Sequence, residues 1–403
     1  MEIMPYISRE RYLEKIKPFI NKDLIKVITG QRRVGKSYFM LQLIDFIQKH
    51  DVNLRILYLN KELDEFSEIT DYKKLLKYIR EHSETRKGKI YVFIDEIQDI
   101  SEFHKALRSL QASGQYDIYI TGSNAAMLSH DISNYLGGRY IEISIQSLSF
   151  GEFMQFHKLE KNEETFIKYA KYGGLPYLIN LELKDEIAYE YIRSIYHTII
   201  LKDIVGRYQI RNLNLLDNLN RFLADNIGSL LSAKRISDFL KSQKLNYTPK
   251  IIIDYLSYLA DAYFIHKVQR ANIKGRKIFE VNEKFYFEDL GLRHVIIPFH
   301  AAEMNKIIEN IVFKHLIYCG YKVFTGQLDK KEIDFWCEKQ DSTIYVQAAY
   351  MITDEKTHQR EFGNLLEIPD NFPKYVVTMD KFRGSTYKGI EHVHVIDFLM
   401  MEL

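Results

Sequence analysis

The clearest chemical signal in the sequence is a glycine-rich segment that ends in lysine and serine. It runs from Gly30 to Ser37 and fits the pattern G-x-x-x-x-G-K-[ST]. The N–H groups of such a loop and the positive end of the following helix form an anion site. We expect Lys36 to reach the β- and γ-phosphates of ATP and the Ser37 hydroxyl to bind Mg²⁺. The predicted nucleotide-binding residues are Gly30, Gln31, Arg32, Arg33, Val34, Gly35, Lys36 and Ser37.

Two adjacent carboxylates, Asp95 and Glu96, follow a run of β-prone residues at 90–94. Such a run is typical of a buried parallel strand, and ligands gather at the carboxyl ends of these strands. We expect Asp95 to hold the magnesium, directly or through water. Glu96 would orient and deprotonate the attacking water. The competing interpretation is an acidic cap that opens a helix over 101–111.

A third apolar run, from Asp117, ends in small polar residues. If this strand lies between the strand before the phosphate loop and the strand before Asp95, its end lies beside the γ-phosphate. Thr121, Ser123 or Asn124 could then sense the phosphate by hydrogen bonding. Ordinary turn chemistry explains these residue types equally well, so both interpretations stay open.

The surrounding elements must place these groups together. Residues 24–29 form a β-branched apolar run, and residues 37–47 carry apolar side chains at helical spacing. The loop therefore joins a predicted strand to a predicted helix, which disfavours a chance glycine turn. Further elements are expected as a helix over 9–19 with Ser8 as its cap, a strand over 54–59 and a helix over 72–80.

Length and composition limit the class of protein. The 403 residues are too many for one ordinary core, so two to four domains are expected. Apolar residues make up 46% and charged residues 27%, as in a folded soluble protein. The net charge of +2 restricts nucleic-acid contact to a local patch. No apolar run approaches the roughly 18 residues of a membrane helix. We therefore expect a cytoplasmic protein with no membrane partner, and free buried thiols at Cys319 and Cys337.

The phosphate loop, the Asp95–Glu96 pair and the polar strand end together resemble the AAA+ superfamily. The Gln-Arg-Arg-Val-Gly-Lys-Ser version of the loop, with segments 136–140 and 148–153, resembles one prokaryotic family. Its members join an AAA-type ATPase module to a C-terminal domain related to restriction-type nucleases. The resemblance covers nearly the whole chain and implies that Arg139 is an arginine finger or γ-phosphate sensor. The alternative is a surface ion pair, and the sequence leaves open an oligomer in which Arg139 serves a neighbouring chain.

The middle of the chain is predicted to be helical. Gly173, Gly174 and Pro176 interrupt helices expected over 163–172 and from Tyr177 to about residue 201. This break resembles the hinge of a small helical lid over the nucleotide, and it also suits a plain turn. Residues 222–264 then predict a helix-turn-helix unit, with segments 265–270 and 277–281 as the wing.

The second helix of that unit would be the DNA-reading helix of a winged helix. Thr248 and Pro249 suit its N-cap and first position, and Ser232 suits the cap of the preceding helix. Lys250 is its one cation, although DNA-reading helices usually carry several Arg, Lys, Asn or Gln side chains. Protein docking is therefore favoured over sequence reading.

The C-terminal part resembles restriction-type nucleases at three positions, Glu309, Asp334 and Gln347. Those enzymes hold Mg²⁺ with carboxylates and carry a lysine two residues after the second strand carboxylate. Here a glutamine stands where glutamate is usual, and Ala349 replaces the lysine. We expect this degenerate site not to cut nucleic acid.

These observations predict an α/β protein: a P-loop AAA-type parallel sheet with a helical lid, then a winged helix and an α/β restriction-endonuclease-like domain. The function predicted is an ATP-binding, ATP-hydrolysing switch or remodeller acting on a protein or nucleic-acid partner. An ATP-dependent DNA-processing nuclease and an ATP-bound interaction module with negligible turnover are the alternatives. The expected domains span residues 1–155, 156–205, 206–274 and 275–403.

Overall fold

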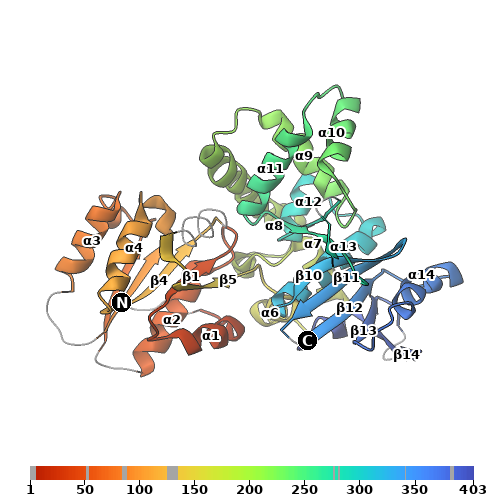
Figure 1. The fold of residues 1–403 in the computed structure, drawn as a ribbon, viewed down its shortest axis with the longest axis horizontal. Coiled ribbons are helices and arrows are strands. Elements are labelled where there is room, and N and C mark those ends of the chain that lie inside the picture. Colours follow the sequence, from red (N-terminus) through yellow and green to blue (C-terminus); the bar gives the residue numbers. More distant parts are fainter. Residues whose placement is uncertain are drawn as a thin grey trace. The chain divides into compact units, whose positions relative to one another are not determined.

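The chain forms two compact units in a computed structural model. The first comprises residues 1–146 and 261–263, and the second comprises residues 147–260 and 264–403. The ribbon in Figure 1 is coloured along the sequence. The structure describes residues 6–50, 54–83, 89–124, 135–275, 277–279, 282–340, 342–381 and 385–403.

The first unit is built on a five-stranded sheet in the order β2-β3-β4-β1-β5, in which every pair of neighbours is parallel. β4 therefore lies between β1 and β3, which is the condition under which its polar end lies beside the phosphate loop. All residues of β1, β3 and β4 are buried, in agreement with their continuous apolar runs. The strands are β1 (Ile25–Thr29), β2 (Arg55–Asn60), β3 (Ile90–Asp95), β4 (Tyr116–Gly122) and β5 (Tyr140–Ser144).

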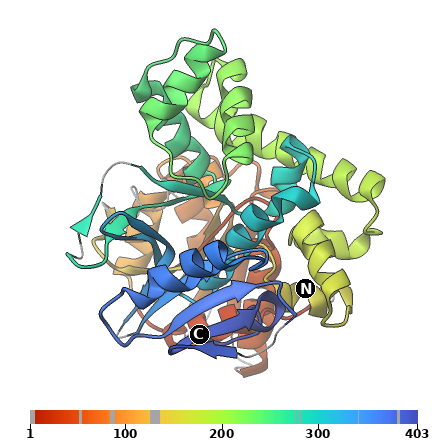
Figure 2. The same cartoon turned by 90° about the vertical axis from the view of Figure 1, so that its right-hand side faces the viewer.

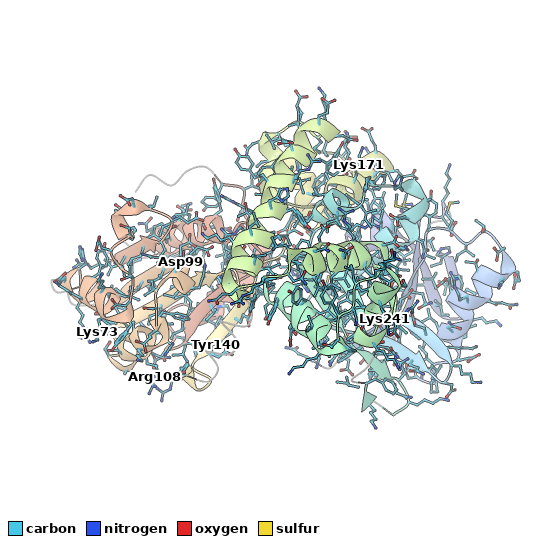
Figure 3. The ribbon with its side chains drawn as sticks, turned by 90° about the horizontal axis from the view of Figure 1, so that it is seen from above. Lys73, Asp99, Arg108, Tyr140, Lys171 and Lys241 are labelled. Carbon is cyan, nitrogen blue, oxygen red and sulfur yellow. The ribbon has the colours of Figure 1, made fainter. Side chains whose placement is uncertain are left out.

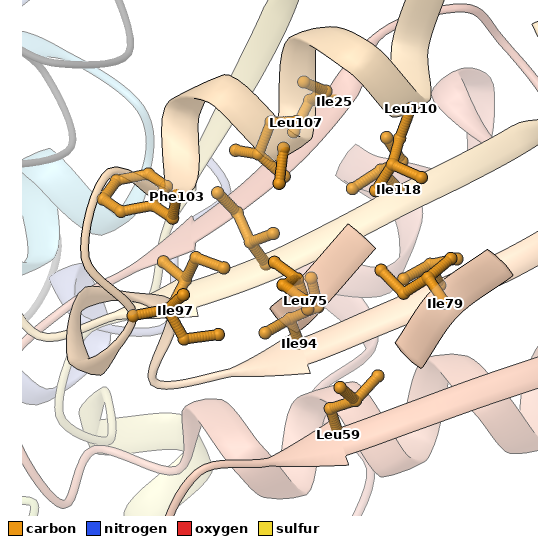
Figure 4. Close-up of a cluster of buried hydrophobic side chains, with 14 of the residues drawn as sticks. Ile25, Leu59, Leu75, Ile79, Ile94, Ile97, Phe103, Leu107, Leu110 and Ile118 are labelled. Carbon is orange, nitrogen blue, oxygen red and sulfur yellow. The ribbon is translucent and has the colours of Figure 1, made fainter. Parts of the chain in front are cut away.

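Helices cover both faces of this sheet (Figure 1). On one face, α3 and α4 pack against the strands in a single apolar cluster, which Figure 4 shows in close-up. The expected cap at Ser8 is wrong, because Arg9 holds the N-cap position of α1 and the Ser8 hydroxyl donates instead to Glu10. The helices are α1 (Glu10–Ile16), α2 (Lys36–His50), α3 (Tyr72–Glu81) and α4 (Phe103–Ala112), with short 3₁₀ turns at Lys17–Phe19, Asp64–Phe66 and Ile97–Asp99.

The second unit begins with a helical region. α7 matches the helix predicted over 163–172, but the helix expected from Tyr177 begins only at Asp185, because Leu181 and Lys184 have extended backbones. Lys171, near the end of α7, is labelled in Figure 3. The elements are α6 (Phe150–His157), α7 (Glu163–Tyr172), a 3₁₀ helix (Pro176–Asn180), α8 (Asp185–Thr198) and a π-helix (Ile199–Gly206).

The glycine pair after α7 is explained by close packing. The Gly174 carbonyl accepts from the Leu148 N–H at 2.7 Å, and the Gly174 N–H donates to Asp289 Oδ2 at 2.7 Å. A Cβ on Gly174 would stand 2.4 Å from the Leu148 carbonyl oxygen, and one on Gly173 would stand 2.2 Å from Asp289 Oδ1. Neither position has room for a side chain, so the pair joins three distant segments of this unit.

Three further helices follow, α9 (Leu213–Asp225), α10 (Ala233–Ser242) and α11 (Pro249–Asp261). Lys241 on α10 is labelled in Figure 3. The predicted caps are present: Ser232 Oγ accepts from the Arg235 N–H at 3.2 Å, and Thr248 Oγ1 accepts from the Ile251 N–H at 3.5 Å.

The predicted wing is wrong in its pairing. β6 (Ile265–Val268) pairs antiparallel with β9 (Lys284–Phe287), and residues 280–281 of the expected partner lie outside the described residues. β7 (Arg270–Asn272) and β8 (Lys277–Ile278) form a separate hairpin instead, and β7 adds to the C-terminal sheet by pairing parallel with β10.

The C-terminal sheet has the strand order β14-β15-β13-β12-β11-β10-β7-β8, so it starts before the expected boundary at residue 275. Its strands face the viewer in Figure 2. β11 and β12 form an antiparallel hairpin, and both cysteines are free and buried, as expected. The strands are β10 (Lys322–Leu328), β11 (Lys331–Lys339), β12 (Ser342–Ala348), β13 (Lys374–Thr378), β14 (Ser385–Tyr387) and β15 (Ile390–His394); the helices are α12 (Leu290–Ile296), α13 (Met304–Tyr318), α14 (Glu355–Leu366) and α15 (Val395–Phe398), with a 3₁₀ turn at Ala301–Glu303.

Membrane insertion of a helix finds no support in the described part of the chain. None of the helices there combines the length and the apolar character needed to span a bilayer.

Replacing Gly174 by alanine should destabilise the second unit by at least about 1–3 kcal/mol, because the new methyl group would overlap backbone atoms of Leu148. Gly363→Ala is the matched control, since it lies in α14 with no atom within 4 Å of its Cβ position. Alanine should be neutral or stabilising there. Denaturant unfolding of both variants measures the difference, and equal stabilities would refute the packing argument.

Candidate nucleotide site and a buried carboxylate cluster

The phosphate loop joins the last residue of β1 to the first turn of α2, as expected. Gly30 has φ +142°, and a Cβ there would stand 2.1 Å from the carbonyl oxygen of Ile145. The Ile145 N–H donates to the Thr29 carbonyl at 2.8 Å. The start of the loop is therefore pinned to the segment after β5, and glycine is required by this close approach.

A buried arginine, Arg9, binds the phosphate loop by hydrogen bonds, and the sequence analysis did not identify it. Arg9 is 5% exposed, and its Nη1 donates to the carbonyl oxygens of Val34 at 3.1 Å and Gln146 at 2.9 Å. Its backbone N–H donates to Gln42 Oε1 on α2 at 3.1 Å. No local sequence pattern indicates this role, because the carbonyl groups that Arg9 binds lie 25 and 137 residues away in the chain.

Lys36 is folded back over the loop. Its Nζ donates to the carbonyl oxygens of Gly30 and Gln31, each at 3.1 Å, and lies 3.9 Å from Glu96 Oε1. The side chain is 4% exposed. The two carbonyl oxygens are neutral, so they leave the positive charge of the ammonium available to a phosphate.

Asp95 ends β3 and is buried beside the loop. Its carboxylate accepts hydrogen bonds from the hydroxyls of Thr121 and Ser37, and from Tyr58 Oη at 3.3 Å. Burial raises the pKa of Asp95, while the two hydroxyls act in the opposite direction. Hydroxyl and carboxylate oxygens are the hard donors that Mg²⁺ prefers, so Ser37 and Asp95 fit the predicted metal.

Glu96 has the left-handed φ of +57°, and its N–H donates to Thr121 Oγ1 at 2.9 Å. It stands before a short 3₁₀ turn with no side-chain cap hydrogen bond, and α4 begins only at Phe103. The acidic-cap interpretation therefore has no support. The Glu96 carboxylate instead accepts from Gln98 Nε2 and faces Lys36.

The three predicted sensor residues differ in what they contact. The Thr121 hydroxyl is engaged by Asp95 and the Glu96 N–H, which makes it a support of the carboxylates. Ser123 and Asn124 are each 1% exposed at the end of β4. Ser123 Oγ has no hydrogen-bond partner among the described residues. A buried hydroxyl without a partner is costly unless a ligand satisfies it.

Arg139 lies at the opposite edge of the sheet. Its carbonyl accepts from the N–H of Ile25, the first residue of β1, while the phosphate loop follows Thr29, the last. Four residues of strand separate these positions by about 13 Å. Arg139 is exposed, and the next residue, Tyr140, is labelled in Figure 3. Arg139 is therefore remote from the predicted nucleotide site of its own chain.

The C-terminal residues Glu309, Asp334 and Gln347 are brought together, on α13, β11 and β12. Gln347 Oε1 accepts from the Asp334 N–H at 2.5 Å. The cation in this cluster is Lys284 of β9, whose Nζ lies 2.8 Å from Glu309 Oε1 and 3.1 Å from Asp334 Oδ1.

The sequence analysis did not identify Lys284. The available signal was a lysine at the start of the aromatic strand sequence Lys-Phe-Tyr-Phe, where a charged residue is unusual. Burial raises the pKa of Glu309 to about 7, and the Lys284 ammonium opposes that rise.

Comparison with known proteins concerns the fold and the family of the chain. Residues 22–154 match a family of AAA domains, AAA_14, and residues 163–303 match DUF8612, a domain family of unknown function. The Walker-type ATPase of Pyrococcus abyssi has a similar fold, with a TM-score of 0.50 and 16% identity over 72% of this chain and 96% of that chain. These matches support an AAA-type ATPase domain over residues 22–154, in agreement with its parallel sheet and phosphate loop.

Two relatives cover far more of the chain. An uncharacterized protein of Haemophilus influenzae is 38% identical over 400 residues, 98% of each chain. An uncharacterized protein of Methanocaldococcus jannaschii is 30% identical over 367 residues, 86% of this chain and 78% of that protein. The chain belongs to the protein family of these two relatives.

Lys36→Ala should abolish tight ATP binding and leave the fold intact, because it removes the cation expected to meet the β- and γ-phosphates. The matched control is Lys49→Ala on the same helix, where the lysine pairs with Asp45 at the surface. Calorimetric titration with ATP measures both. Unchanged affinity in a folded Lys36→Ala variant would contradict the assignment.

Proposed function

We propose that this protein is an ATP-hydrolysing switch or remodeller that acts on a protein or nucleic-acid partner. The observation that carries the proposal is the convergence of Lys36, Ser37, Asp95 and Glu96 at the carboxyl edge of the five-stranded sheet. Phosphoryl transfer needs positioning and charge neutralisation more than covalent chemistry, and these groups supply both.

In this proposal Lys36 leaves the loop carbonyls for the phosphates of ATP. Ser37 and Asp95 would hold Mg²⁺, which would neutralise the charge of the phosphates. Glu96 accepts a proton from the attacking water, since its carboxylate is held 3.9 Å from Lys36 and beside Asp95. The hydroxyl of Ser123 and the amide of Asn124 sense the γ-phosphate from the end of β4.

Glu96→Gln should retain ATP binding and lose hydrolysis, because an amide keeps the shape of the carboxylate and cannot accept the proton. Glu102→Gln is the matched control, since Glu102 lies in the same loop region and pairs with Lys105 at the surface. Single-turnover hydrolysis and ATP titration are measured on both variants. Turnover by Glu96→Gln at the unaltered rate would reject Glu96 as the base, whereas negligible turnover by the unaltered protein would favour the ATP-bound interaction module.

Arg139 fits a role on the nucleotide of a neighbouring chain better than on its own. It is exposed at the amino edge of the sheet, far from its own phosphate loop. An exposed arginine at such a distance suits an arginine finger supplied in trans, as P-loop enzymes use with their activators. The proposal therefore includes an oligomer in the active state.

Arg139→Ala should lower the rate of hydrolysis by a factor on the order of 10³–10⁵ and leave ATP affinity nearly unchanged. An arginine finger stabilises charge that develops only in the transition state. The specific activity of the unaltered protein should also rise with protein concentration. Arg108→Ala, another exposed arginine of the same unit labelled in Figure 3, is the control. Equal turnover by Arg139→Ala and the unaltered protein would make Arg139 a surface residue.

The three-helix region α9–α11 with the β6–β9 pair is proposed as the winged helix that meets the partner. Ile251 and Ile253 on α11 are 37% and 51% exposed, close to Lys250. Exposed isoleucines on the would-be reading helix favour a protein partner over base reading, which uses hydrogen-bonding side chains.

The alternative function is DNA processing by the C-terminal domain, and the meeting of Glu309 with Asp334 favours it. We expect no cleavage, because Gln347 is neutral and Ala349 carries no charge. Single- and double-stranded DNA and RNA are incubated with the full chain and Mg²⁺ or Mn²⁺, with and without ATP. Cleavage that disappears in Asp334→Ala would make the nuclease the primary function.

A further inference from the structure

The ammonium group of Lys284 is the centre of the C-terminal carboxylate cluster. It has three N–H donors and three carboxylate partners from two other elements: Glu309 Oε1 at 2.8 Å, Glu332 Oε1 at 2.8 Å and Asp334 Oδ1 at 3.1 Å. The Lys284 side chain is 2% exposed, and Glu309 is nearly as buried. A buried ammonium needs this kind of complete pairing to remain charged.

Other donors of the protein also bind oxygens of the cluster. Asp334 Oδ2 accepts from the Ala348 N–H at 3.1 Å, and Tyr286 Oη donates at 2.7 Å to Glu309 Oε1, the oxygen that Lys284 also contacts. The Gln347 side-chain amide accepts from the Asp334 N–H and donates to Glu361 Oε2 at 2.9 Å. A restriction-type nuclease would hold Mg²⁺ at these positions, but here both oxygens of Asp334 and one oxygen of Glu309 already contact protein donors. With the Lys284 ammonium between these carboxylates, the residues do not fit a metal.

We propose that the Lys284 ammonium is the resident cation of this cluster and excludes divalent metal ions from it. Lys284 occupies the point where the carboxylates of α13 and β11 converge, which is where a divalent ion would have to bind. β9, α13 and β11 are joined through this single charge. The cluster is consequently a structural ion-pair cluster.

The proposal makes a prediction for the unaltered full-length chain without nucleotide. Mn²⁺ binding, followed by the electron paramagnetic resonance signal of free Mn²⁺, should be the same in the unaltered protein, in Asp334→Asn and in Glu332→Gln. Glu332 is 42% exposed, so its variant tests the cluster with little disturbance of the core. Loss of bound Mn²⁺ in either variant would show that the native cluster holds metal and would overturn the proposal.

The second arm removes the ammonium. Lys284→Ala should gain one additional bound Mn²⁺, and Lys284→Ala combined with Asp334→Asn should lose it again. The unfolding temperature of Lys284→Ala should also rise on addition of Mn²⁺ more than that of the unaltered protein, because metal replaces the missing charge. The matched control is Lys267→Ala on the paired strand β6, where the lysine is 45% exposed and bonds to one carboxylate, Glu283. It should gain no metal.

A folded Lys284→Ala variant that gains no Mn²⁺ would overturn the proposal. If that variant folds only when Mn²⁺ is supplied, the dependence itself supports the proposal. If it does not fold under either condition, the comparison of the unaltered protein with Asp334→Asn and Glu332→Gln decides the question. None of these measurements depends on ATP turnover, so failure of the proposed ATPase would leave the result unaffected.

Discussion

The candidate nucleotide site depends on a parallel sheet in which β4 lies between β1 and β3. The parallel direction brings the carboxyl ends of all three strands to one edge, and the strand order places Thr121 beside β3, where it bonds to Asp95 and to the backbone of Glu96. The hydroxyl of Ser37 reaches the same carboxylate from the loop after β1. An antiparallel β3 would place Asp95 at the opposite edge of the sheet from the loop, with the same residues in the sequence.

Two lysines show how the environment of an ammonium decides what it can do. Lys36 contacts loop carbonyls and stands 3.9 Å from Glu96, so a phosphate offers it a better partner than it has. Lys284 contacts three carboxylates at 2.8–3.1 Å, so no incoming ligand can improve on its pairing. Both side chains are almost fully buried, and they differ in how closely these carboxylates approach the ammonium. The first arrangement suits a binding site, and the second suits a permanent structural contact.

Buried polar contacts join distant segments of the second unit. Gly174 bonds to Leu148 and Asp289, and the neighbouring Glu288 pairs with Lys314 and with His266 at 2.5 Å. The ammonium of Lys314 is the main charge that lowers the pKa of Glu288 to about 2, against the opposing effect of its burial. Such contacts require their partners to be in place, which makes this region sensitive to small substitutions. They also explain why a glycine pair that resembles a hinge is tightly packed on both sides.

The sequence by itself determined the phosphate loop, the acidic pair after β3 and the polar end of β4, because each depends on residues that are close in the chain. It also predicted β1 to β4, α2, α3 and α7, each of which is a continuous stretch of the chain. The sequence analysis paired the segment that contains β6 with the segment that contains β8, whereas β6 pairs with β9. The residue types in β8 and β9 do not specify which strand each one pairs with. Arg9, Lys284 and the remote position of Arg139 were decided by the tertiary structure alone. Their roles depend on charges and carbonyls that are far apart in sequence, and only the folded chain brings those groups into contact.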